Sequence, residues 1–282
     1  MLKRFSKFYC AIISGASSPH HHMEKNIPAL WDKIWTSASI ERTIFLLAKE
    51  ENSIRWQRIK SIVLQEFGSF NKLRTIELGA GMATYSALMA ARGAKVTIVD
   101  YSDEALKKAR IFFKRLNLPA RFIKQNALSL TKALFNKYDI SMSFGLNEHF
   151  AGVERLKVNK AHFDVLRSGG LTFISVPNKY NPFYRLSKFF SQQANVWIFG
   201  EEYPYSRDEF KSIFKRLKIR KCNFLGDSFF NSFKAIVPRR LVKRLFKINR
   251  NITCSIIKKE HGTFLDEYLG AVLVAYGKKL KA

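Results

Sequence analysis

The middle of the chain alternates short apolar runs with longer amphipathic stretches. Strand-like runs occupy residues 73–78, 95–99, 122–123, 140–144 and 171–176, and helical spacing occupies about 84–92, 104–116 and 156–167. Strands that alternate with helices at this spacing predict a parallel sheet with crossover helices on both faces. The sequence therefore predicts an α/β fold.

The stretch 104–116 shows how clearly some helices are marked. Ser102 can cap the helix, and Asp103 and Glu104 suit the positive end of its dipole. One apolar stripe then follows at helical spacing, formed by Leu106, Ala109, Phe113 and Leu116.

The two ends of the chain differ from this core. Residues 27–67 have helical spacing, with Trp31 and Trp35 on one face. Towards the other end we expect helices over 180–199 and 207–217, a strand over 219–224 and a last strand over 268–276. We therefore divide the chain into an N-terminal basic and helical cap (1–67), a core (68–180), and a segment that completes the same domain with a lid, a basic insert and the last strands (181–282).

Length and composition limit the class of protein. The 282 residues are 47% hydrophobic and include 25 Phe, which is enough for a folded core and argues against disorder. No apolar run approaches the length of a membrane span. Cys10, Cys222 and Cys254 lie far apart and have neither disulfide nor zinc spacing, so we expect a reducing, cytoplasmic location.

The first residues resemble a targeting signal only weakly. Lys3, Arg4 and Lys7 precede a short apolar stretch at 8–13. A basic start that touches a membrane or packs on the domain is an equal alternative. The histidines at 20–22 are consecutive and cannot converge on one metal ion from a regular element, and no other convergent set occurs, so we expect no metal.

Charge adds a further question. The chain has 49 Lys and Arg against 22 Asp and Glu, a formal net charge of +27. This excess suits an anionic partner such as nucleic acid or a membrane surface, but it also suits ordinary solvated basic faces.

A glycine loop is the most informative feature of the sequence. Gly79-Ala80-Gly81 follows a predicted strand and opens a predicted helix, where a backbone can approach a ligand closely. Asp100 ends the next strand, 19 residues after Gly81, where a carboxylate can bind ribose hydroxyls. Thr84 stands where a nicotinamide-binding loop has its third glycine. Glu77 would repel a pyrophosphate but suits a cationic amino acid group.

These residues resemble the first motif of the class I S-adenosylmethionine-dependent methyltransferases, with Ala83 in place of the last glycine. Further motifs resemble the small-molecule, type 11-like branch of this family in the same order along residues 73–178. They are Asp100-Tyr101-Ser102, Gln125-Asn126-Ala127-Leu128, the run Tyr138 to Phe150 with its Glu148-His149 pair, Val165 to Leu171, and Val176-Pro177-Asn178.

The resemblance implies a Rossmann-like, seven-stranded, mostly parallel sheet whose last strand is antiparallel, with S-adenosyl-L-methionine as the cofactor. It implies a cofactor site formed by Glu77, Gly79, Ala80, Gly81, Asp100, Tyr101, Asn126, Ala127 and Phe144. Asn126 stands where the family more often has Asp, and its carbonyl can still accept a hydrogen bond from the adenine amino group.

His149 is our candidate catalytic base, because an imidazole titrates near neutrality and this residue follows the fourth strand. A structural role, capping a helix or bracing the loop, is the alternative. We expect Glu148 to support a turn. Tyr180 and the other aromatics of the cap and lid are candidates for an apolar acceptor pocket or for a small core.

We therefore expect a methyltransferase that acts on a small molecule or a lipid-linked metabolite. The alternatives are an RNA methyltransferase and a non-catalytic binding module that keeps the cofactor fold. Residues 228–259 contain no acid, and Pro238 begins a predicted basic amphipathic helix within them. This helix favours peripheral contact with the inner, anionic face of a membrane, with RNA binding and a solvated face as alternatives. Oligomeric state is left open.

Overall fold

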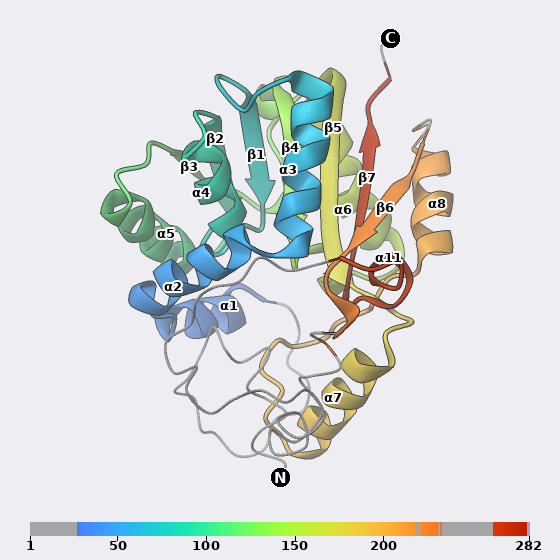
Figure 1. The fold of residues 1–282 in the computed structure, drawn as a ribbon. Helices are drawn as coiled ribbons and strands as arrows, with labels where there is room; N and C mark the ends of the chain where they lie inside the picture. The colour runs from blue at the N-terminus through green and yellow to red at the C-terminus, as the bar shows by residue number, and fades with distance from the viewer. Residues whose placement is uncertain (1–26, 218, 220, 231, 233–261, 281–282) are drawn as a thin grey trace, which may run out of the picture.

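A single seven-stranded sheet forms the centre of the computed structural model, which describes residues 27–217, 219, 221–230, 232 and 262–280 (Figure 1). The strand order is β3-β2-β1-β4-β5-β7-β6. The strands are β1 (Arg74–Leu78), β2 (Lys95–Asp100), β3 (Arg121–Lys124), β4 (Tyr138–Phe144), β5 (Leu166–Pro177), β6 (Asn223–Gly226) and β7 (Val272–Lys278).

The sheet is mixed, and its first five strands are parallel. β1 pairs in parallel with both β2 and β4, and β7 runs antiparallel between β5 and β6. The chain order reverses at β1, so the carboxyl ends of β1, β2 and β4 border a topological switch point, where open α/β sheets bind their ligands. The predicted sheet, with its antiparallel last strand, is confirmed.

Helices cover both faces of the sheet (Figure 1). α3 (Ile54–Phe67), α4 (Thr84–Ala90) and α5 (Asp103–Arg115) pack on one face, and α6 (Gly152–Val165) and α8 (Arg207–Arg216) on the other. Ser102 caps α5 as predicted, because its Oγ accepts from Ala105 N at 3.1 Å. Because both faces are covered, β1, β2 and β4 are buried at nearly every position.

The remaining helices gather near the carboxyl edge of the sheet. They are α1 (Pro28–Thr36), α2 (Ile40–Glu51), α7 (Pro182–Gln193) and α11 (Asp266–Leu269). In Figure 1, α1, α2 and α7 lie beyond the arrowhead of β1. The predicted helical region 27–67 is three helices, because the hydroxyls of Ser39 and Ser53 cap new helices and break the run.

Three predicted boundaries are wrong. β5 begins at Leu166, not at 171, and β6 lies at 223–226, where it pairs with Leu273–Tyr276 of β7. The predicted last strand 268–276 also began too early. Asp266 carboxylate oxygens accept from the backbone N–H groups of Thr263 and Phe229, and this holds residues 266–269 in a helical turn before β7.

Among the helices that the structure describes, none is both long and apolar enough to cross a membrane. The N-terminal stretch 1–26 and the predicted amphipathic helix from Pro238 lie outside the described residues.

Candidate functional site

The glycine loop between β1 and α4 has the backbone that its sequence predicted. Gly79 and Gly81 have φ of +57° and +52°, in the left-handed region that favours glycine. Ala83, where the family motif has its last glycine, has φ of +54° and is buried. The alanine thus adopts the backbone conformation for which the motif uses glycine.

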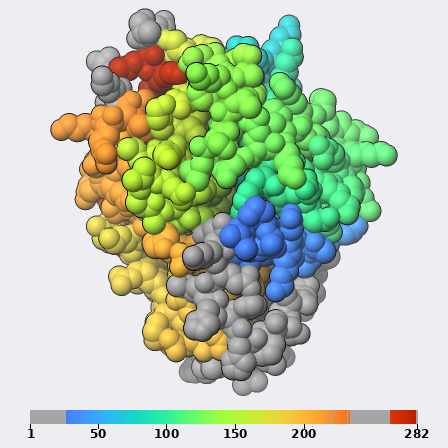
Figure 2. Space-filling model, turned by 180° about the vertical axis from the view of Figure 1, so that it is seen from behind, coloured from blue at the N-terminus to red at the C-terminus, as the bar shows by residue number. Residues whose placement is uncertain are grey.

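Side chains pack tightly over both glycines. A Cβ atom on Gly81 would lie 2.4 Å from the Trp35 ring, and one on Gly79 would lie 2.4 Å from Leu146. Figure 2 shows α1, which carries Trp35, in blue against the green surface of the central part of the chain. Asp32 of the same helix accepts a hydrogen bond of 2.5 Å from Ser102 Oγ. α1 therefore lies over the loops that follow both β1 and β2.

Asp100 connects these two loops. One carboxylate oxygen accepts from Gly81 N and the other from Ser102 N, both at 2.9 Å. The residue is 4% exposed, and burial raises the pKa of its carboxyl. Each carboxylate oxygen has a second lone pair with which it can accept from a ligand hydroxyl.

Glu77 extends from β1 towards α4. Its Oε2 accepts from Ser86 N at 2.9 Å and from Ser86 Oγ at 2.6 Å. Burial raises the pKa of Glu77 to about 7, and these two hydrogen bonds oppose the shift. A carboxyl group with this pKa changes its charge near neutrality.

Asn126, at the end of β3, uses its side chain locally. Its Oδ1 accepts from Leu128 N at 2.8 Å and begins the short 3-10 helix Ala127–Ser129. The second lone pair of this oxygen remains for a ligand, as the predicted role requires.

A cavity of about 390 Å³ runs from the glycine loop to the ends of β4 and β5. Of the predicted cofactor residues, Glu77, Ala80 and Phe144 line it. The others are not among its lining residues and lie along the same edge of the sheet: Gly79, Gly81, Asp100, Tyr101, Asn126 and Ala127.

The far wall of the cavity contains residues that sequence reasoning missed. Glu50, Arg55 and Tyr85 all line it. Arg55 Nη2 lies 3.0 Å from Glu50 Oε1, Tyr85 OH donates to the same oxygen, and the Tyr85 ring stacks on Phe144. Only Tyr85 had a sequence signal, its position just after the glycine loop.

His149 lies close to the cavity but is not among its lining residues. It is 9% exposed, and its ring meets the edge of Trp31 at 4.8 Å between centroids. Nδ1 lies 2.9 Å from the carbonyl oxygen of Glu201. A carbonyl only accepts, so Nδ1 carries the proton and Nε2 carries the lone pair. Burial lowers the pKa of His149 to about 4, so the ring is neutral at pH 7.

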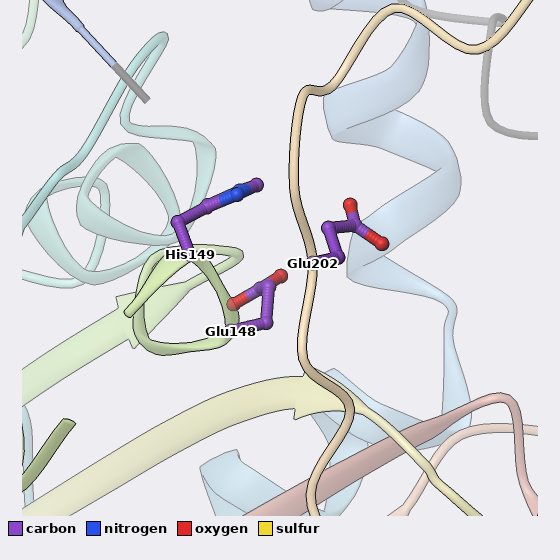
Figure 3. Close-up of side chains that lie close together, drawn as sticks. All are labelled: Glu148, His149 and Glu202. Atoms are coloured by element: carbon purple, nitrogen blue, oxygen red, sulfur yellow. The ribbon is translucent and has the colours of Figure 1, made fainter. Parts of the chain in front are cut away.

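Glu148, for which we predicted only a role in a turn, lines the cavity. Its carboxylate, the His149 ring and the Glu202 carboxylate present atoms within 4.8 Å of one another (Figure 3). The Lys188 ammonium lies 3.8 Å from Glu202 Oε2 and donates to Glu202 O at 2.8 Å. This lysine already supplies a positive charge to the carboxylates, and we assign no metal ion here.

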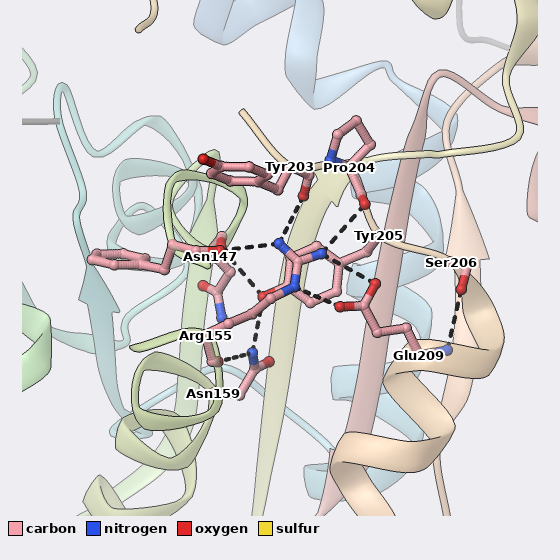
Figure 4. A network of polar contacts seen from close by, with 9 residues as sticks. Asn147, Arg155, Asn159, Tyr203, Pro204, Tyr205, Ser206 and Glu209 are labelled. Carbon is pink, nitrogen blue, oxygen red and sulfur yellow. Dashed lines mark hydrogen bonds and ion pairs between the residues drawn. The ribbon is translucent and has the colours of Figure 1, made fainter. Parts of the chain in front are cut away.

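A partly buried arginine, Arg155, holds the segment that carries Glu202 (Figure 4). The Arg155 guanidinium lies 3.4 Å from the centre of the Tyr205 ring and pairs with Glu209. It also donates to the carbonyl oxygens of Phe150 at 3.1 Å and Tyr203 at 2.8 Å. Arg155 therefore ties residues 203–205 to the loop after β4 that carries Glu148 and His149.

The aromatic residues of the cap and lid have different roles. Trp35 lines the cavity, whereas Tyr180 is 54% exposed and does not. Tyr205 is fully buried in the core, and Tyr184 is buried with its hydroxyl donating to Glu202 Oε2 at 2.6 Å. The degree of burial, and not aromatic character, distinguishes the aromatic residues of the pocket from those of the core.

Known proteins resemble the core of the chain. A family model described as a methyltransferase domain matches residues 76–170. A ubiquinone biosynthesis O-methyltransferase of Nitrosomonas europaea is 30% identical over 133 residues, which are 47% of this chain and 54% of the relative. One from Rickettsia prowazekii is 20% identical over 55% of this chain and 60% of the relative. The chain thus spans little more than half the length of these curated relatives.

Solved structures share the fold over a longer range. A SAM-dependent methyltransferase of Thermotoga maritima, a possible histamine N-methyltransferase, has a TM-score of 0.58 at 14% identity and covers 90% of this chain and all of its own. The magnesium protoporphyrin IX methyltransferase of Synechocystis with bound SAH has a TM-score of 0.52 at 12% identity, over 89% of this chain and 93% of its own. Residues 76–170 therefore match a methyltransferase domain, and the chain has the fold of S-adenosylmethionine-dependent methyltransferases.

Proposed function

We propose that this protein transfers a methyl group from S-adenosylmethionine to a hydroxyl group of a small or lipid-linked molecule. The observation that carries this proposal is the glycine loop tied to Asp100 at the switch point of the sheet, with a cavity that continues past Phe144. The curated relatives are O-methyltransferases of ubiquinone biosynthesis, and this supports oxygen as the acceptor atom.

The chain's own residues fit the cofactor. Asp100 would accept from the ribose hydroxyls, Glu77 would face the amino acid ammonium, and Asn126 would accept from the adenine amino group. Tyr101 and Ala127 would flank the adenine, and Gly79, Ala80 and Gly81 would let the ligand approach the backbone. S-adenosylmethionine would supply an already activated methyl group.

In this proposal the cap (1–67) and the lid (181–282) close over the core (68–180) and select the acceptor. The cap contributes Trp35, Glu50 and Arg55 to the cavity wall, and the segment 181–282 contributes Val272. The chain's tasks are to align the acceptor oxygen, to exclude water and to remove the acceptor proton.

Calorimetry tests the cofactor. We expect S-adenosylmethionine to bind, and Asp100→Ala to weaken it about ten- to a hundredfold, since a charged hydrogen-bond acceptor is lost. Asp103→Ala is the control, because this acid of α5 is exposed and pairs with Lys124 at the surface. Binding of NAD without binding of S-adenosylmethionine would contradict the proposal.

Transfer of labelled methyl groups to a prenylated catechol, with RNA as the competing acceptor, tests the reaction. Methylated RNA with no methylated catechol would favour the RNA methyltransferase. Turnover of neither, with intact cofactor binding, would favour a binding module.

His149 remains our sequence-based candidate for the base. Its neutral ring and its Nε2 lone pair suit the task, although it is not among the lining residues of the cavity. If His149 is the base, the variant His149→Asn should lower kcat about a hundredfold and remove a kinetic pKa, while its cofactor affinity stays the same. An unchanged pH–rate profile would leave His149 a structural role.

We also propose that the basic stretch 228–259 places the protein on an anionic membrane, where a lipid-linked acceptor would be available. The support is the sequence pattern alone. We expect the protein to float with anionic vesicles, and not with neutral vesicles, at low salt. Equal distribution between the two would exclude this contact.

A further inference from the structure

Glu148 is the buried acid of the site with a carboxyl oxygen that nothing in the described chain satisfies. It is 3% exposed and lines the cavity, and its Oε2 has no hydrogen-bond partner among the described residues. Glu77, Asp100 and Glu202 all accept hydrogen bonds. Buried polar atoms are nearly always paired, so an unpaired one next to a cavity indicates a missing ligand group.

Glu148 lies in the cavity wall, just beyond the strand that separates β1 from β5 in the sheet. It follows Phe144 and Gly145 at the end of β4, and the cavity wall beside it continues into Ser175–Pro177 of β5. On one side lie Glu77 and the glycine loop, which would hold the amino acid end of the cofactor. On the other side lies the pocket that we assign to the acceptor.

The charged side chains around Glu148 are already paired with one another. The net charge of this cluster therefore depends on whether Glu148 is protonated. Lys188 from α7 faces Glu202 at 3.8 Å, and Tyr184 donates to Glu202 at 2.6 Å, so these contacts favour the ionised form of Glu202, although burial raises its pKa. Arg155 from α6 is paired with Glu209. His149 is neutral.

Burial and the Glu202 charge raise the pKa of Glu148 well above its usual value, although Arg155 and Lys188 oppose the shift. Without a ligand, this shift therefore favours the protonated form of Glu148. A positive charge brought into the cavity would favour the ionised form.

We propose that Glu148, rather than His149, is the catalytic base: it ionises against the sulfonium of S-adenosylmethionine and then takes the proton of the acceptor hydroxyl. The acceptor oxygen forms a bond to the methyl carbon, and the electrons of the carbon–sulfur bond stay on sulfur. The hydroxyl proton moves to the Glu148 carboxylate. This inference rests on the proposed function.

The first test needs no acceptor. In infrared difference spectra at about pH 8, above the pKa of about 7 of Glu77, we expect free protein to show the C=O stretch of a buried protonated carboxyl. Glu148→Gln removes this band, and Glu154→Gln, at an exposed position of α6, keeps it. S-adenosylmethionine abolishes the band, whereas S-adenosylhomocysteine, which has a neutral thioether, leaves it.

Calorimetry in buffers of different ionisation enthalpy gives a second measurement. Wild type releases about one proton more with S-adenosylmethionine than with S-adenosylhomocysteine, and Glu148→Gln removes the difference. Glu77 does not affect the comparison, since both ligands carry the same ammonium group.

The contrast between the two ligands is measured on the wild-type protein, so it stands even if a variant fails to fold. A band that survives S-adenosylmethionine, or equal proton release with both ligands, overturns the assignment of Glu148. Absence of any S-adenosylmethionine binding would instead refute the proposed function.

Discussion

At the residue scale, backbone conformation and burial set the properties of the cofactor loop. Gly81 lies under the Trp35 ring with φ of +52°, and Glu77 is buried with a pKa of about 7. The loop therefore has a steric requirement at Gly81 and an electrostatic requirement at Glu77, and each can be tested separately.

Gly81→Ala tests the steric requirement, with Gly152→Ala as a matched control. Both glycines have φ of +52°, but a Cβ on Gly152 would meet nothing within 4 Å. We expect the left-handed backbone to lower the free energy of unfolding by about 1–2 kcal/mol in both variants, measured in urea. Gly81→Ala should also lose S-adenosylmethionine affinity. Equal affinity in the two variants would show that the space over Gly81 does not matter.

Glu77 predicts a pH dependence of cofactor binding. Its pKa of about 7 means that it is neutral below and ionised above this pH, and only the ionised form pairs with the ligand ammonium. Affinity for S-adenosylmethionine and S-adenosylhomocysteine should therefore rise as pH rises from about 6 to 8, by up to about tenfold per pH unit below the pKa. Calorimetry of S-adenosylhomocysteine binding to Glu77→Gln should give a flat profile, and a flat profile with this ligand in wild type would refute the role.

At the element scale, α1 connects the loops that form the cofactor site. Asp32 accepts from Ser102 Oγ and from Glu104 N at the start of α5, and Lys108 Nζ donates to Ala38 O just after α1. The helix is thus fixed to α5 while its Trp35 lies on the glycine loop. Because α1 contacts both loops, we expect this helix to respond to ligand binding.

Tryptophan fluorescence measures this coupling. Trp35 lines the cavity, so we expect S-adenosylmethionine to change the emission of wild type and Trp35→Phe to remove most of that change. Trp197→Phe is the control, since Trp197 donates to Gly200 O and is not among the lining residues. A full signal in Trp35→Phe would mean that α1 does not respond to the ligand.

At the scale of the whole molecule, buried neutral histidines link the fold to pH. His162 of α6 is fully buried between Ser141 Oγ, 2.7 Å from Nδ1, and Asn147 Oδ1, 3.3 Å from Nε2. Burial lowers its pKa to about 3, and the pKa of His149 to about 4. Glu77, whose pKa is raised, acts in the opposite direction by favouring the folded state at low pH.

For His162 the sign is therefore clear. Its stabilising contribution is full above about pH 6.5 and is lost as pH falls towards 3, since only the unfolded chain binds the proton in this range. Urea unfolding of wild type and His162→Gln should differ in slope by up to about 1.4 kcal/mol per pH unit between pH 6 and 4. Parallel curves would show that His162 is not neutral in the folded protein.

The sequence by itself determined the alternation of strands and helices, the glycine loop, Asp100 at the end of β2 and the Ser102 cap. Each depends on residues close together in the chain, where apolar period, capping and backbone freedom act locally. This is why the motifs alone indicated the family and the sheet. The misplaced starts of β5 and β7 have the converse reason, because pairing between distant strands sets them. Leu166 of β5 pairs with Tyr138 of β4, and Val272 of β7 pairs with Pro177 of β5.

Only the tertiary structure decided the second half of the site. His149 and Glu201 meet across 52 residues of sequence, and Arg58 reaches Asp266 across 208. The charged neighbours of Glu148, Lys188 and Glu202, come from α7 and from the segment after it. Glu50, Arg55 and Tyr85 come together from three helices. Burial and charge pairing depend on what lies nearby in space. The motif contains both Glu148 and His149, but the sequence could not show which of them faces the cavity.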